Sequence, residues 1–90
     1  MTRQNPNRDR AETIALDALV FLAAGPERIE RFLRQSGLEA ATLKARAGEA
    51  ETLRAVLDFL LADERLAEEF CQQNGLSPRE LWAAQHLLEA

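Results

Sequence analysis

Apolar residues recur along the whole chain at intervals of three and four, which is the spacing of helices that bury one face. No stretch alternates with period two, and Val20 and Val56 are the only valines, so a sheet is not expected. We therefore predict an all-α fold, a compact bundle of about six short helices. The first helix has the widest apolar arc and should be central in the core; its apolar residues are Ile14, Ala15, Ala18, Leu19, Phe21 and Leu22.

Glycine, proline and capping residues predict where these helices begin and end. Gly37 and Gly75 are each followed by leucine, a pattern typical of a helix stop with positive φ. Ser77-Pro78-Arg79-Glu80 is a capping box with proline at the first helical position. We expect a disordered tail over residues 1–5, with Asn5 as the first cap, and a single helical domain over residues 6–90. The expected helices cover residues 6–24, 26–36, 40–47, 50–62 and 64–74, with a last helix after Ser77.

The chain contains an internal repeat. Residues 19–45 align without a gap to residues 57–83, and 11 of the 27 aligned pairs are identical. The shared residues are apolar anchors and a turn glycine, which indicates that a supersecondary unit packs against its own copy. We predict two three-helix copies with approximate internal two-fold symmetry.

Charge is distributed unevenly between the two copies. The net charge is −4, but residues 1–46 carry eight basic and six acidic side chains, giving +2, and residues 47–90 carry three and nine, giving −6. Such polarity can orient an electrostatic partner or a head-to-tail self-contact. The longest apolar run, residues 18–24, is too short to span a bilayer, and the charged N-terminus does not resemble a secretory signal. We expect a cytoplasmic protein with no membrane contact.

Few residues offer catalytic or metal chemistry. Cys71 is the only cysteine and His86 the only histidine, so neither a thiolate cluster nor a multi-histidine metal site can form. Cys71 lies on an apolar stripe and is expected to be a small buried thiol. A pair of Cys71 with His86 is the only constellation on which an enzyme could rest, and it lacks an orienting group. We expect no catalytic residues, no metal, no cofactor and no small-molecule substrate.

Two Gly-Leu hairpins resemble the turn of a helix-turn-helix motif. DNA affinity depends on basic side chains, and the last helix has only Arg79, which Glu80 and Glu89 offset. The equivalent helix of the first copy has Lys44 and Arg46. A nucleic-acid-binding regulator is therefore the alternative function. It requires one basic face, made of Arg3, Arg8, Arg10, Arg34, Lys44 and Arg46.

Trp82 is the only tryptophan, and Lys44 occupies the aligned position of the first copy. Because this small chain has few large residues to fill its centre, we expect Trp82 to pack in the core. The other interpretation is that it contacts a partner. Trp82, Lys44 and Arg46 are the candidate partner-binding residues.

Three segments resemble a family of small bacterial proteins of about 90 residues, classed as a domain of unknown function. They are residues 18–22, residues 31–33 with Gly37-Leu38, and residues 56–61 running into Asp63-Glu64. The resemblance implies a stand-alone bacterial protein and brings no catalytic or binding residues. From the residues, the favoured function is a non-catalytic helical interaction or adaptor module, which binds another protein or itself as a homodimer.

Overall fold

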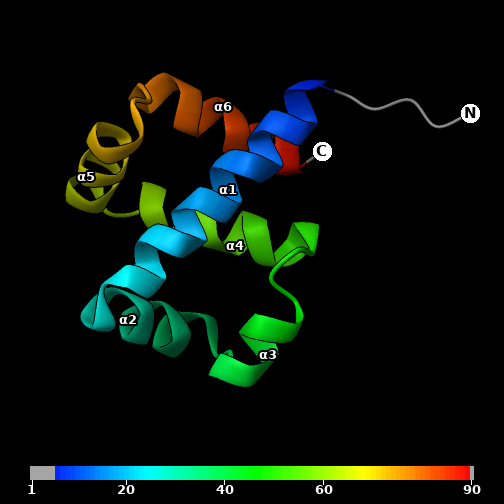
Figure 1. The fold of residues 1–90 in the computed structure, drawn as a ribbon, viewed down its shortest axis with the longest axis vertical. Helices are drawn as coiled ribbons and strands as arrows, with labels where there is room; N and C mark the ends of the chain where they lie inside the picture. Colours follow the sequence, from blue (N-terminus) through cyan, green and yellow to red (C-terminus); the bar gives the residue numbers. More distant parts are fainter. Residues whose placement is uncertain (1–5, 90) are drawn as a thin grey trace, which may run out of the picture.

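The computed structural model describes residues 6–89, and over this range the protein is all-α, as the sequence predicts (Figure 1). The helix ends confirm the predicted boundaries except that α3 and α4 stop short of Ala47 and Ala62. The predicted tail and the Asn5 cap lie outside the described residues. The six helices are α1 Pro6–Ala24, α2 Pro26–Ser36, α3 Ala40–Ala45, α4 Ala50–Leu61, α5 Glu64–Asn74 and α6 Pro78–Glu89.

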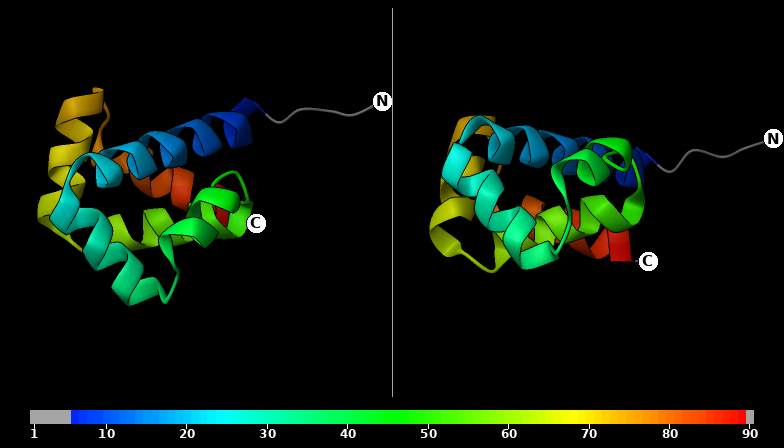
Figure 2. Two further views of the ribbon diagram at one scale, coloured as in Figure 1. Left: turned by 60° about the horizontal axis from the view of Figure 1, so that its bottom comes forward. Right: turned by 90° about the horizontal axis from the view of Figure 1, so that it is seen from below.

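Helices α1, α4 and α6 pack against one another, and α1 crosses over α4 (Figures 1 and 2). Helix α2 packs on α1 at one end, while α5 packs on α4 and α6. The buried apolar side chains form one cluster, which includes Ala15, Ala18 and Leu22 of α1 at full burial. The predicted central place of α1 in the core is therefore confirmed.

Two aromatic pairs join the helices of the two copies. The rings of Phe21 and Phe70 lie 5.6 Å apart, and those of Phe32 and Phe59 lie 5.4 Å apart. Because Phe21 aligns with Phe59 and Phe32 with Phe70, these contacts are reciprocal between the copies, as a two-fold relation requires. The third helices differ, since α3 has 6 residues and α6 has 12. Approximate two-fold symmetry between the two complete three-helix copies therefore stays a prediction.

Both predicted glycine stops have a left-handed backbone, with φ of 75° at Gly37 and 64° at Gly75. The amide of Leu76 donates to the carbonyl of Cys71 at 2.9 Å, the hydrogen bond that defines a Schellman stop. The amide of Leu38 instead donates to the Ser36 hydroxyl at 3.3 Å. The two stops therefore share backbone conformation but differ in hydrogen bonding.

Side-chain caps fix the starts of α5 and α6. One oxygen of Asp63 accepts from the amides of Arg65 and Leu66 at 3.1 and 3.3 Å. In the predicted capping box, Ser77 and Glu80 exchange hydrogen bonds, each 3.2 Å long. These contacts satisfy amides that have no partner within the helix, so each start is defined by local chemistry.

The sharp turn between α1 and α2 is held by Arg28. Its Nε and Nη2 atoms donate to the carbonyl of Phe21 at 3.1 and 2.7 Å, and its guanidinium lies 4.1 Å from the centre of the Phe21 ring. The arginine thus satisfies a carbonyl in the last turn of α1 and places positive charge at the negative end of the helix dipole. A Cβ atom at Gly25 would lie 2.5 Å from Cζ of Arg28, so any other residue there would displace the Arg28 guanidinium.

Candidate functional site

The outer side of the second half of α1 carries exposed apolar side chains beside the exposed Asp17. Phe21 and Leu22 are buried, whereas Leu16 is 41% exposed and Val20 is 67% exposed. Residues four apart lie on the same side of a helix, so Leu16 and Val20 face solvent together. Apolar side chains on a solvent-facing side of a helix are suited to contact with another element. Leu16 and Val20 therefore form a small exposed apolar stripe on the outer side of α1.

This exposed stripe runs into an apolar groove with a volume of about 580 Å³, which we call the α1–α3 groove. Leu19 and Ala23 of α1 belong to its lining and connect it to Val20. Its volume lies in the range typical of binding pockets. The lining has a single charged side chain and consists of Leu19, Ala23, Ile29, Leu33, Ala40, Ala41, Leu43, Lys44 and Ala47.

The second copy has a depression at the matching place, which we call the α4–α6 groove. Its volume is about 530 Å³. Ala23, Ile29, Ala40, Ala41 and Lys44 of the α1–α3 groove align with lining residues of this second groove. It is far more charged than the first, since Glu64, Glu68 and Arg79 line it. The full lining is Leu61, Glu64, Ala67, Glu68, Pro78, Arg79 and Trp82.

Trp82 lines the α4–α6 groove and is 57% exposed, so the expectation that it packs in the core is wrong. Leu81, Ala84 and Leu88 are the core residues of α6. One residue along a helix turns the side chain by about 100°, which directs Trp82 away from the face that Leu81 buries. The His86 ring packs edge-on against the indole, with ring centres 4.0 Å apart.

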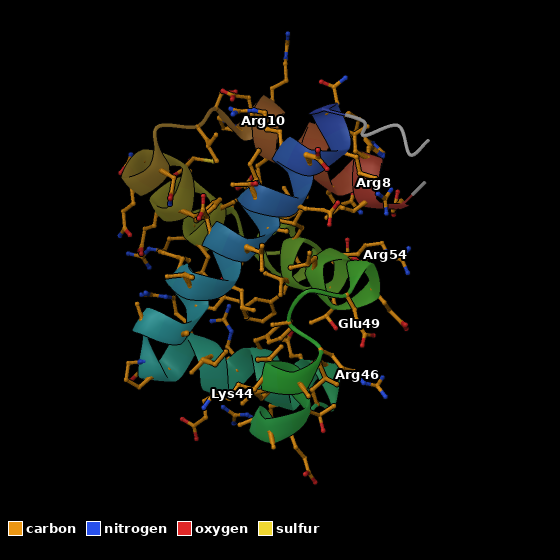
Figure 3. The ribbon with its side chains drawn as sticks, turned by 45° about the vertical axis from the view of Figure 1, so that its right-hand side comes forward. Arg8, Arg10, Lys44, Arg46, Glu49 and Arg54 are labelled. Atoms are coloured by element: carbon orange, nitrogen blue, oxygen red, sulfur yellow. The ribbon has the colours of Figure 1, made fainter. Side chains whose placement is uncertain are left out.

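The candidate basic residues are divided between the two ends of the molecule. Figure 3 places Arg8 and Arg10 at the end where α1 begins, and Lys44 and Arg46 at the far end. Lys44 lines the α1–α3 groove, whereas Arg46 is exposed after α3 and is not part of the lining. The structure does not bring these four side chains into one patch. Arg3, which the nucleic-acid interpretation also invokes, lies outside the described residues.

The two arginines of α1 contact α6. Arg10 forms an ion pair with Glu80 at 2.8 Å, and Arg8 donates to the carbonyl of Leu87 at 3.0 Å. The Arg10 guanidinium, together with the Ser77 amide, lowers the pKa of Glu80. Both arginines therefore contribute to packing between the first and last helices.

The two residues on which an enzyme would rest have different surroundings. Cys71 is buried in the core, and burial raises the pKa of its thiol, with a smaller contribution from the charge of Glu80. A raised pKa disfavours the reactive thiolate. The His86 side chain is half-exposed, and its Nδ1 atom lies 3.5 Å from Oε2 of Glu89. Glu89 and Trp82, the two residues that contact the His86 ring, both belong to α6.

Residues 6–89 hold neither a cluster of metal ligands nor a membrane-spanning helix. No three His, Cys, Asp or Glu side chains are grouped closely enough there to hold a metal ion. None of the described helices combines the length and the apolar character that crossing a membrane needs.

Sequence reasoning singled out Lys44 and Trp82 but missed the apolar lining beside Lys44. The groove depends on how α1, α2 and α3 meet, which the pattern of one helix does not reveal. One signal was present in the run of residues 18–24, where seven consecutive apolar positions exceed what one buried face needs. An excess of this kind predicts that a second face of the helix is also covered.

Comparisons with curated proteins and with solved structures gave no match. A family model described as a protein of unknown function (DUF3572) matches residues 8–90, nearly the whole chain. The chain belongs to this family.

Proposed function

We propose that this protein is a non-catalytic interaction module that binds an amphipathic helix of another protein in the α1–α3 groove. The observation that carries the proposal is the continuity of the exposed stripe of α1 with that groove. Leu16 and Val20 are exposed, and Leu19 and Ala23 extend the same apolar surface into the lining. Contiguous exposed apolar surface rimmed by polar residues is typical of protein-binding sites.

A helical ligand suits this surface because the stripe and the groove follow helices. Amphipathic helices bind such grooves with apolar side chains spaced three and four residues apart. Lys44 is the one charged residue of the lining, so it favours a ligand with a carboxylate beside its apolar face. The ligand we expect therefore combines aliphatic or aromatic anchors with an acidic flank.

Capture from lysate tests this proposal. The tagged protein is incubated with lysate of its native cells, with and without nuclease, and the retained proteins are identified by mass spectrometry. We expect a discrete set of proteins that survives nuclease treatment. Retention that depends on nucleic acid would contradict the proposal and support the nucleic-acid-binding alternative.

A matched pair of variants connects the captured proteins with the groove. Val20→Glu places a charge on the exposed stripe, and glutamate has a better helix propensity than valine, so the fold should persist. Gln72→Glu adds the same charge at an exposed position of α5 in the other copy. We expect Val20→Glu to lose the captured proteins and Gln72→Glu to retain them. Equal retention by both variants would contradict a docking role for this surface.

A further inference from the structure

We propose that a second copy of this chain occupies the α1–α3 groove, and that it does so with the Trp82 face of its α4–α6 groove. The contact is head to tail, since two different surfaces of the chain meet. This inference rests on the proposed docking role of the α1–α3 groove and identifies one ligand for it.

The two surfaces are complementary in apolar character. Trp82 is the one large aromatic side chain that is strongly exposed among the described residues. The α1–α3 groove offers only aliphatic lining around Lys44, with Ile29 and Leu33 on one wall and Leu19 on another. A partly exposed tryptophan against an aliphatic groove is the kind of anchor that dominates protein interfaces.

The two surfaces are also complementary in charge. Lys44 gives the α1–α3 groove its single charge, and it is positive. Glu64 and Glu68 line the groove that contains Trp82, and Arg79 offsets only one of them. The same polarity holds for the two halves of the chain, with +2 over residues 1–46 and −6 over residues 47–90. Opposite potentials steer two such surfaces together.

A symmetric contact between two identical surfaces would be less favourable than the head-to-tail contact. Two Trp82 faces would bring the acidic pairs Glu64 and Glu68 of both chains together, and like charges at an interface are unfavourable. Two α1–α3 grooves would meet without an aromatic side chain to fill them. A heterologous contact repeats from chain to chain, so it produces a ring or a series of oligomers.

The chain provides its own reporter for this contact, since Trp82 is the only tryptophan and there is no tyrosine. We expect the fluorescence emission of the wild-type protein to shift to shorter wavelength as concentration rises, because the indole leaves water. Sedimentation velocity should show the average mass rising over the same range. An emission maximum and a mass that both stay constant up to the highest soluble concentration would overturn the proposal.

A pair of complementary variants tests the direction of the contact. Trp82→Ala removes the aromatic anchor and leaves the α1–α3 groove intact. Ala41→Glu blocks that groove and leaves Trp82 intact; position 41 is exposed in the first turn of α3, where an acidic residue suits the helix dipole. Each variant alone should self-associate at least about tenfold more weakly than wild type. An equal mixture should form a 1:1 dimer, because one intact contact remains between the two chains.

The outcomes separate this inference from the proposed function. A mixture that stays monomeric would overturn the head-to-tail contact, as would single variants that associate like wild type. If wild type does not self-associate but still captures other proteins through the α1–α3 groove, the head-to-tail contact is overturned and the proposed function is retained. Gln73→Glu, at an exposed position of α5 on the side away from Glu64 and Glu68, serves as the folded control and should associate as wild type does.

Discussion

At the scale of single residues, the four phenylalanines form two ring pairs between the two copies. Phe32 and Phe70 are 1% and 0% exposed, and each packs against a phenylalanine of the other copy. Aromatic pairs at these distances add to the free energy of burial. Truncation of a phenylalanine in either ring pair should therefore lower the stability of this small domain markedly.

We expect Phe32→Ala or Phe70→Ala to lower the free energy of unfolding by about 3–5 kcal/mol, because each leaves a large cavity in the core. Such a loss is a large fraction of the stability of a small domain. Urea denaturation followed by circular dichroism measures it. Val20→Ala removes exposed atoms and is the control, with an expected change within about 0.5 kcal/mol. A loss under about 1 kcal/mol for either phenylalanine would contradict the core assignment.

Two carboxylates couple the fold to pH. Hydrogen bonding to Arg31 is the main cause of a lowered pKa at Asp63, and hydrogen bonding to Arg10 has the same effect at Glu80. A pKa that is lower in the folded state means that the unfolded chain binds more protons in acid. The contribution to stability is therefore present at neutral pH and is lost as the pH falls below about 4.

We expect the double variant Asp63→Asn, Glu80→Gln to lose less stability than wild type between neutral pH and pH about 3. Urea midpoints of both proteins at the two pH values measure the difference. The variant should be less stable than wild type at neutral pH and closer to it in acid. An identical acid-induced loss in both proteins would show that these two carboxylates do not carry the pH dependence.

Trp82 shows where residue-level reasoning from sequence stops. The apolar positions of α6 could be read from helical spacing, and Leu81 is buried as expected. Whether the adjacent tryptophan is covered depends on whether another element reaches that side of α6. The sequence carries no local signal for this, and the structure leaves the indole 57% exposed.

At the scale of elements, the helices were predictable because their ends are encoded locally. Gly37, Gly75, Pro26 and Pro78 set stops and starts through their own backbone preferences, independently of tertiary packing. The end of α3 was predicted less well. This helix packs only weakly on the other helices, and it lacks the left-handed glycine that ends α2 and α5. It ends at Ala45, with Arg46 as its cap, instead of continuing to Ala47.

The glycines of the chain offer a matched test of the two stops. Gly37→Ala and Gly75→Ala should each cost about 1–2 kcal/mol, because a Cβ atom is strained at φ of 75° and 64°. Beyond the adjoining residues of the chain, no atom lies within 4 Å of the added Cβ at either site, so the cost comes from the local backbone conformation. Gly48→Ala also adds a Cβ in open space but without positive φ, and it should be neutral or slightly stabilising. Equal thermal melting temperatures for all three variants would contradict the left-handed stops.

At the scale of the whole molecule, the candidate site arises from packing. The α1–α3 groove combines side chains from three helices with an exposed stripe on the first. The sequence predicted that α1 is central and that the copies differ in charge. It did not predict that aligned positions line two grooves of different character, one aliphatic with Lys44 and the other acidic with Trp82.

The proposed function requires that the outer side of α1 and the α1–α3 groove bind a protein. The most direct measurement is a two-dimensional ¹H–¹⁵N NMR titration of the labelled protein with a protein captured in the lysate experiment. We predict that the largest shift changes fall on Leu16, Val20, Ile29, Leu33 and Lys44, with little change where Arg8 and Arg10 contact α6. Changes confined to that opposite end, with the groove residues unaffected, would contradict the claim.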